Sequence, residues 1–233
     1  TIVAPDAHEV FEDEQTDEFS SYFDRSTTPK VLVTTTLHPS RDLVRFAKEL
    51  RVIIGWDPCE YRTRTPETIK QIVKGAIERD FTDMIVVSEH DGKPHTLTLI
   101  HLPGGPTAQF KITNLVMRKN IPNHGRPTDH TPELILNNFS TRLGHTIGRM
   151  FASLFPHDPE FVGRRVITFH NQRDYIFFRQ HRYVFDGPER ARLQELGPRF
   201  TLKLRWLQKG TFSVHHGEYE WHQKKEIETS RRR

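Results

Sequence analysis

The stretch Gly197-Pro198-Arg199-Phe200-Thr201-Leu202-Lys203-Leu204-Arg205-Trp206-Leu207-Gln208-Lys209-Gly210-Thr211-Phe212 has the two-residue period of a β-strand. The Gly-Pro pair before the strand and the Lys-Gly pair after it mark turns. Alternate positions predict one face that packs on a core, formed by Phe200, Leu202, Leu204 and Trp206. The positions between them predict a polar outer face, formed by Arg199, Thr201, Lys203 and Arg205. A strand that turns a row of cations outward is suited to bind a polyanion.

Charge is distributed unevenly around this strand. The chain of 233 residues has 34 Lys and Arg against 30 Asp and Glu, and eight of those acids lie in residues 1–24, which hold no Lys or Arg. The remaining residues therefore carry 22 acids against all 34 basic side chains. A basic body with an acidic leader favours a nucleic-acid-binding domain. The alternative is a solvated basic surface with an acidic tail that has no ligand.

The domain organisation follows from composition. Residues 1–28 predict an acidic, poorly ordered leader, whose aromatic residues could anchor it to a partner or to the domain itself. Residues 29–212 predict one folded domain with halves at about 29–121 and 132–212, separated by a polar connector rich in Pro, Gly and Asn. Residues 213–233 predict a C-terminal extension with a basic end at 231–233.

Periodicity predicts an α/β fold. Strands are expected at 30–36, 84–87, 96–100, 107–117, 134–136, 165–170, 175–178 and 183–185, before the basic strand. Helices are expected from Ser40, which is a suitable N-cap, after Pro66, and from Ser140 to Phe155.

The two halves repeat one order of features. Each has a strand, then a hydroxyl residue and an arginine at a helix start, which are Ser40-Arg41 and Thr141-Arg142. Each later has a hairpin, a Gly-Pro pair (Gly105-Pro106 and Gly197-Pro198) and a final long strand. The shared order indicates an internal duplication of an α/β unit.

The helix from Ser140 is the second candidate site. Arg142, His145 and Arg149 are three and four residues apart, so they share one face of the helix. Arg142 lies in the first turn, where the helix N-terminus favours phosphate binding. The alternative is that both arginines are solvated. We expect this face and the cations of the basic strand to form one RNA surface.

The segment 169–183 mixes aromatic rings, amides and cations, as RNA-binding proteins do. Most of its rings are expected in the core, which leaves Arg173, Arg179 and Arg182 as candidate RNA contacts. Lys209, after the basic strand, is a further candidate, and Arg62 and Arg64 are weaker ones.

Sequence motifs for catalysis are absent. The chain has no GxxxxGK[ST] loop, GxSxG elbow or HExxH pair, and Cys59, its one cysteine, has no nucleophile signature around it. The 14 histidines are not at zinc-site spacings. We therefore expect no enzyme activity, no cofactor and no metal. No apolar run approaches the roughly 20 residues that span a bilayer, so we expect no membrane partner.

Four segments together carry a family resemblance. They are Pro132–Phe139, Thr141–His145, Phe169–Arg179 and Gly197–Leu202, and with them the region from about Pro29 to Phe212 resembles the Brix-domain superfamily. The resemblance implies a Brix domain of two pseudo-symmetric halves, each a mixed sheet with helices, similar to the anticodon-binding domains of aminoacyl-tRNA synthetases. The family's sigma-like motif corresponds to residues 197–212. Many members also carry an Arg-Gly loop after the first helix, but residues 59–65 lack the glycine.

The resemblance also implies a function. The protein would be a non-catalytic, rRNA-binding assembly factor of the large ribosomal subunit, located in the nucleus and nucleolus. Its partners would be precursor and mature large-subunit rRNA, other large-subunit assembly factors and, as a further option, ribosomal proteins. Two alternatives remain open. One is a protein-interaction scaffold that recruits another assembly factor, and the other is a small-subunit factor that acts with a small nucleolar RNA.

Overall fold

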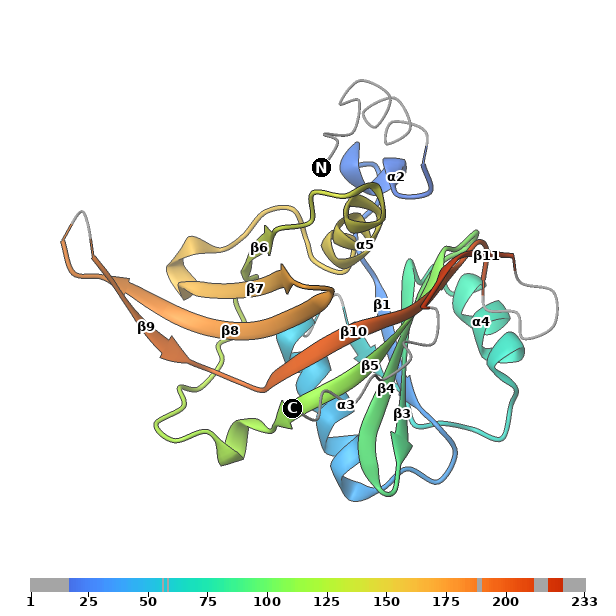
Figure 1. Ribbon diagram of the computed structural model, residues 1–233, viewed down its shortest axis with the longest axis horizontal. Helices are drawn as coiled ribbons and strands as arrows, with labels where there is room; N and C mark the ends of the chain where they lie inside the picture. Colours follow the sequence, from blue (N-terminus) through green and yellow to red (C-terminus); the bar gives the residue numbers. More distant parts are fainter. Residues whose placement is uncertain (1–16, 56, 58, 188–189, 212–217, 224–233) are drawn as a thin grey trace, which may run out of the picture.

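The basic strand lies at the centre of one continuous mixed sheet (Figure 1). The computed structural model describes residues 17–55, 57, 59–187, 190–211 and 218–223. Strand β10 (Arg199–Gln208) pairs antiparallel with β5 (Thr107–Val116) on one side and with β8 (Tyr175–Phe185) on the other. The strand order is β2-β1-β3-β4-β5-β10-β8-β7-β6.

The sheet has the same plan on both sides of the β5–β10 pair. In the first half β1 runs parallel to β3, and β4 and β5 follow antiparallel. In the second half β6 runs parallel to β7, and β8 and β10 follow antiparallel. The bounds are β1 Val31–Thr35, β3 Asp83–His90, β4 Lys93–His101, β6 Glu133–Asn137 and β7 Arg165–Gln172. The expected α/β class is confirmed, but the halves share one sheet instead of forming two.

Two helices cover the same face of this sheet. Helix α3 (Arg41–Ile54) begins at Ser40, whose side chain accepts a hydrogen bond from the Leu43 amide, as expected. Helix α5 (Arg142–Ala152) is capped by Thr141, one residue later than the expected Ser140. Their apolar sides pack with the inward residues of both halves in one large core.

Among the described residues, only the first half has a helix on the opposite, outer face. Helix α4 (Ile69–Ile77) begins in a Thr68–Gln71 capping box and packs over β1, β3 and β4 in a second, smaller core. The structure describes every residue between α5 and β7, and the helical element there is a short 3₁₀ turn, η2 (Phe161–Gly163). Within the described residues, no helix therefore covers the outer face of β5, β10 and β8.

The basic strand itself departs from simple alternation. A register shift between Leu204 and Trp206 leaves Arg205 as the extra residue of a β-bulge opposite β5. Beyond the bulge, Leu207 is completely buried and Trp206 is half-buried on the outer face, beside Gln109. The prediction that Trp206 belongs to the core face is wrong, because one extra residue exchanges the two faces of the strand.

Other departures concern short or merged elements. Residues 183–185 continue β8 and do not form a separate strand. Three short strands were not predicted, since so few residues show no clear period. Those strands are β2 Cys59–Tyr61, β9 Ala191–Glu195 and β11 Tyr219–His222. A second short 3₁₀ turn, η1, spans Arg118–Asn120.

The described part of the leader is folded onto the domain. Residues 20–23 form the short helix α2 (Ser20–Phe23), and Phe19 is 1% exposed in the main core. The Tyr22 hydroxyl donates to the carbonyl oxygen of Phe155, 2.8 Å away. This differs from the expected poorly ordered leader over 1–28 and supports the anchoring of its aromatic residues to the domain. Residues 1–16 and the basic tail at 224–233 lie outside the described residues.

A buried arginine joins the two halves. Arg165, the first residue of β7, is 1% exposed. Its guanidinium donates to the carbonyl oxygens of Val52 and Ile53 at the end of α3, over 3.1 and 2.9 Å, and to those of Thr128 and His130 in the connector. Burial lowers its pKa to about 10, so Arg165 keeps its positive charge at neutral pH. A cation at this end complements the helix dipole.

Candidate nucleic-acid interface

The predicted cations do not form one surface, because α5 and the outward residues of β10 lie on opposite sides of the sheet. On the helix side, Arg142, Arg149 and Lys209 line a hollow of about 290 Å³. On the outer face, alternation places Arg179 on β8 and Arg199 and Lys203 on β10. We expected the cations of the basic strand and the Arg142 helix to form one surface. Lys209 does lie beside that helix, but Arg199 and Lys203 lie on the other side of the sheet.

The outer face carries a row of cations in register. Lys203 lies directly opposite Lys111 of β5 and, on its other side, opposite Tyr175 of β8. The Lys203 ammonium lies 5.0 Å from the centre of the Tyr175 ring, in a cation–π contact. Like charges directly opposite each other destabilise a sheet. The Lys111–Lys203 pair is thus unfavourable on its own and would be stabilised by a bound anion.

Two arginines extend this face toward its far end. Arg199 donates to a carboxylate oxygen of Glu195 over 2.8 Å, and Arg179 donates to the carbonyl oxygen of its neighbour Phe178. Burial, in spite of the nearby Glu195, lowers the pKa of the Arg179 guanidinium. Both arginines are half-buried, so their side chains are positioned by the protein before any ligand arrives.

On the helix side the leader occupies Arg149. The Arg149 guanidinium donates to both carboxylate oxygens of Asp17, over 2.6 and 2.8 Å. The ring of Phe23 lies 3.9 Å from the guanidinium carbon. Arg149 is therefore held by an acid and an aromatic ring of the leader, in the way a phosphate and a base would hold it.

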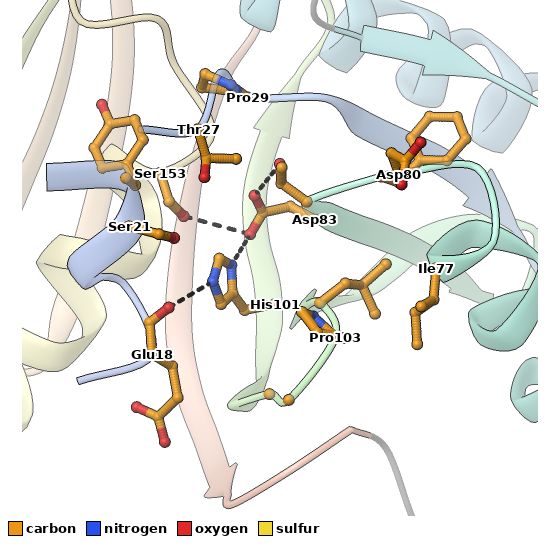
Figure 2. A pocket seen from close by; sticks show the side chains of 16 residues that line it. Glu18, Ser21, Thr27, Pro29, Ile77, Asp80, Asp83, His101, Pro103 and Ser153 are labelled. Atoms are coloured by element: carbon orange, nitrogen blue, oxygen red, sulfur yellow. Dashed lines mark hydrogen bonds and ion pairs between the residues drawn. The ribbon is translucent and has the colours of Figure 1, made fainter. Parts of the chain in front are cut away.

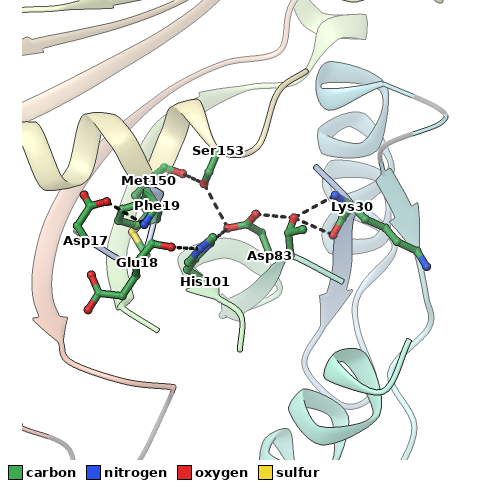
Figure 3. A network of polar contacts seen from close by, with 9 residues as sticks. Asp17, Glu18, Phe19, Lys30, Asp83, His101, Met150 and Ser153 are labelled. Atoms are coloured by element: carbon green, nitrogen blue, oxygen red, sulfur yellow. Dashed lines mark hydrogen bonds and ion pairs between the residues drawn. The ribbon is translucent and has the colours of Figure 1, made fainter. Parts of the chain in front are cut away.

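A buried polar network positions this leader (Figures 2 and 3). His101 Nδ1 lies 2.8 Å from a carboxylate oxygen of Asp83, and His101 Nε2 lies 3.1 Å from the backbone carbonyl oxygen of Glu18. The Ser153 hydroxyl donates to the same Asp83 carboxylate over 3.3 Å, as the dashed lines of Figure 3 show. Next to the network lies a cavity of about 520 Å³ between the leader and the β4–β5 turn.

The titration of this network follows from its burial. Burial raises the pKa of the completely buried Asp83. Burial alone would lower the pKa of His101, but the hydrogen bond and the charge of Asp83 outweigh it and raise that pKa above its usual value. The hydroxyl of Ser153 bonds to the carboxylate and not to the imidazole, so this is not the arrangement of a nucleophile and its base. The network instead fixes Glu18.

Neither a reactive thiol nor a metal-binding site has support among the described residues. Burial raises the pKa of the Cys59 thiol to about 12, which keeps it protonated and unreactive at neutral pH. No group of three or more His, Cys, Asp or Glu that could hold a metal ion is found in the described part of the chain. None of the helices described is long and apolar enough to cross a membrane.

None of the remaining candidates lines the hollow beside α5. Arg173 is exposed in the β7–β8 turn, where its φ is 52°. Arg182 donates to the carbonyl oxygen of Arg126 in the connector, over 2.9 Å. Arg62 forms an ion pair with Glu60 over 3.0 Å.

Sequence reasoning missed three residues of the outer face. Lys111 belongs to the strand expected at 107–117, from which no candidate was chosen. Trp206 was assigned to the core, and Tyr219 lies on a strand that was not predicted. Only Lys111 had a usable signal, since it lies between the inward residues Phe110 and Ile112.

Comparison with known proteins gives a consistent result. The sequence matches the model of the Brix domain family over residues 37–206. Ribosome production factor 1 of Mus musculus is 56% identical over 235 residues, which cover 100% of this chain and 67% of that protein. Ribosome production factor 1 of Saccharomyces cerevisiae is 46% identical over 219 residues, covering 93% of this chain and 72% of that protein.

A solved structure has the same fold. The crystal structure of a probable ribosomal biogenesis protein from Aeropyrum pernix K1 superposes with a TM-score of 0.56 at 16% sequence identity. The superposition covers 75% of this chain and 96% of that chain.

Proposed function

This chain belongs to the Brix domain family and acts in ribosome biogenesis, and from that premise we propose that it binds precursor rRNA of the large ribosomal subunit as a non-catalytic assembly factor. The proposal includes residence in the nucleus and nucleolus. Other large-subunit assembly factors and ribosomal proteins would be its partners. The relatives that are named ribosome production factors support a role in ribosome biogenesis, and the basic charge of the chain supports binding to RNA.

The observation that carries the proposal is the cationic outer face of β5, β10 and β8. Lys111, Lys203 and Arg199 lie on it in neighbouring strands, and the described chain places no helix over them. Phosphate contacts of this kind give affinity that falls steeply with salt and depends little on sequence. We assign these residues and Arg205 the main share of the affinity, with Arg179 beside them.

Filter binding of large-subunit precursor rRNA fragments, titrated at several salt concentrations, tests the proposal. The double variant Lys203→Glu with Arg205→Glu should lower the affinity by at least about tenfold and reduce the salt slope by about two. Arg190→Glu with Arg192→Glu, on the exposed β8–β9 hairpin, is the matched double charge reversal away from this face. If the two variants bind alike, this face is not the RNA surface.

A second function is favoured by the β8–β9 hairpin. Its residues Val184, Phe185 and Leu193 are 44%, 68% and 62% exposed, which is unusual for large apolar side chains on one short hairpin. Such a surface suits a protein partner. Co-purification with and without ribonuclease separates the two functions, because a directly bound protein survives digestion of the RNA.

A further inference from the structure

The β-bulge creates a recess on the outer face that has the composition of a nucleotide-binding site. It has a volume of about 540 Å³, and β4, β5, β10 and β11 meet around it. Because Arg205 is the extra residue of the bulge, Trp206 turns away from the core and lines this recess. Without the bulge the same side chain would lie among Leu204 and its neighbours.

Aromatic rings form one wall of the recess. Tyr219 of β11 is 51% exposed, and its ring meets that of Trp206 edge to face, with 5.8 Å between the ring centres. The ring of His222 lies edge to face against Tyr219 in turn. Proteins that bind unpaired bases stack them on exposed aromatic rings, and Tyr219 supplies a half-exposed ring of this kind.

Cations also line the recess. Lys111 and Arg205 line the recess, and no Asp or Glu is present among the described residues that do so. The Arg205 guanidinium is positioned by a 2.7 Å hydrogen bond to the side-chain oxygen of Gln223. Burial, with the positive charges of Lys111 and Arg205 nearby, lowers the pKa of His95 at the same place. The local potential is therefore positive.

We propose that this recess binds one unpaired nucleotide of an RNA strand, with the base stacked on Tyr219 next to Trp206 and the adjoining phosphate held by Lys111 and Arg205. Gln109 and Gln223 lie in the same recess and supply amide groups for the edge of the base. A base in a duplex is stacked between its neighbours and is not available to such a site, so the recess selects single-stranded segments. The inference rests on the proposed function and adds that the RNA is single-stranded where it contacts this part of the outer face.

The test uses a single-stranded RNA oligonucleotide of about eight residues and the same sequence paired into a duplex. The chain contains three Trp, so we compare the fluorescence of the wild type with that of Trp206→Phe. The single strand should quench the wild type, and the quenching should be largely lost in the variant. Duplex of the same sequence should quench little.

Affinity gives the second readout. Tyr219→Ala should weaken binding of the single strand by about tenfold with an unchanged salt slope, because it removes stacking and no charge. Tyr219→Phe retains the ring and should bind as the wild type does. Lys111→Gln should instead reduce the salt slope by about one. Phe185→Ala removes an exposed ring far along the sheet and is the matched control. Tyr219 is exposed, so its variants should melt at the wild-type temperature.

The outcomes separate this inference from the proposed function. If wild type binds RNA, Lys203→Glu with Arg205→Glu weakens that binding, and Tyr219→Ala changes neither affinity nor quenching, the recess is not a nucleotide site while the proposed function stands. If wild type binds no RNA even at low salt, both fail. If polyglutamate quenches Trp206 as strongly as the RNA does, the recess takes acidic protein segments and the inference is overturned.

Discussion

Asp83 and Arg165 are the first residues of β3 and β7, and each reaches the carboxyl end of the helix that belongs to the opposite half. Asp83 accepts a hydrogen bond from Ser153, the C-cap of α5, and Arg165 donates to carbonyl oxygens at the end of α3. Equivalent positions in the two halves, at the start of β3 and of β7, thus hold side chains of opposite charge. Each half is completed by a side chain of the other.

Replacing Arg165 should destabilise the whole domain. Arg165→Met would leave the carbonyl oxygens at the end of α3 without their donors in a buried place, at a cost of about 3 kcal/mol or more in the free energy of unfolding. Urea denaturation measures the loss. Arg192→Met removes an exposed ion pair with Asp186 and should cost under about 1 kcal/mol. Similar losses for both variants would show that Arg165 does not join the halves.

Stability should fall as pH rises past neutrality. The pKa of His101 is raised in the folded protein, so the protonated imidazole contributes stability that is fully present below its unfolded value of about 6.5 and is lost as pH rises through the folded value. Melting temperatures between about pH 6 and 8 test this. His101→Gln removes this contribution, so the variant should lose less stability over that window than the wild type does. An unchanged slope in the variant would assign the effect to other groups.

Removing the charge of Asp17 should strengthen RNA binding. Asp17→Asn keeps an oxygen acceptor for the Phe19 amide but loses the ion pair with Arg149, so less negative charge competes with phosphate for this arginine. Filter binding should show a severalfold gain at low salt that declines as salt is added. Asp158→Asn removes the same charge from an exposed pair with Arg25 and serves as the control. Equal affinities of the two variants would contradict competition by the leader.

Two glycines should respond in opposite directions to alanine. At Gly105, with φ at +97°, a Cβ would overlap the backbone of Gly210, so Gly105→Ala should separate the ends of β5 and β10 and destabilise the domain. At Gly75, inside α4, a Cβ meets nothing within 4 Å, so Gly75→Ala should stabilise by about 0.5–1 kcal/mol. Chemical denaturation of both variants checks the pair.

Sequence predicted the parts of this fold that have strong local signals. Alternation identified β10 and β5, and Ser40 and Pro66 marked where α3 and α4 begin. The repeated order of features anticipated the matched halves. The bulge at Arg205 escaped prediction because an apolar residue, Trp206, stands at the next expected core position and alternation alone gives no sign of an insertion.

Sequence reasoning identified charged residues that face outward on β10, but it did not predict where they lie relative to helix α5. The cations of β10 were correctly picked as outward-facing at Arg199 and Lys203. Their separation from Arg142 and Arg149 depends on which face α5 covers, and no local pattern encodes that. The contact between Asp17 and Arg149 joins residues 132 positions apart in the chain, which also lies beyond pattern reasoning.

The pairing of β5 with β10 has a consequence for the order in which the chain matures. β5 ends at Val116, and its partner does not begin until Arg199, so the central seam joins segments made far apart in time during synthesis. Until β10 emerges, β5 exposes an unpaired edge, which is a hazard for aggregation. A nascent chain that stalls before Arg199 would therefore need protection at this edge.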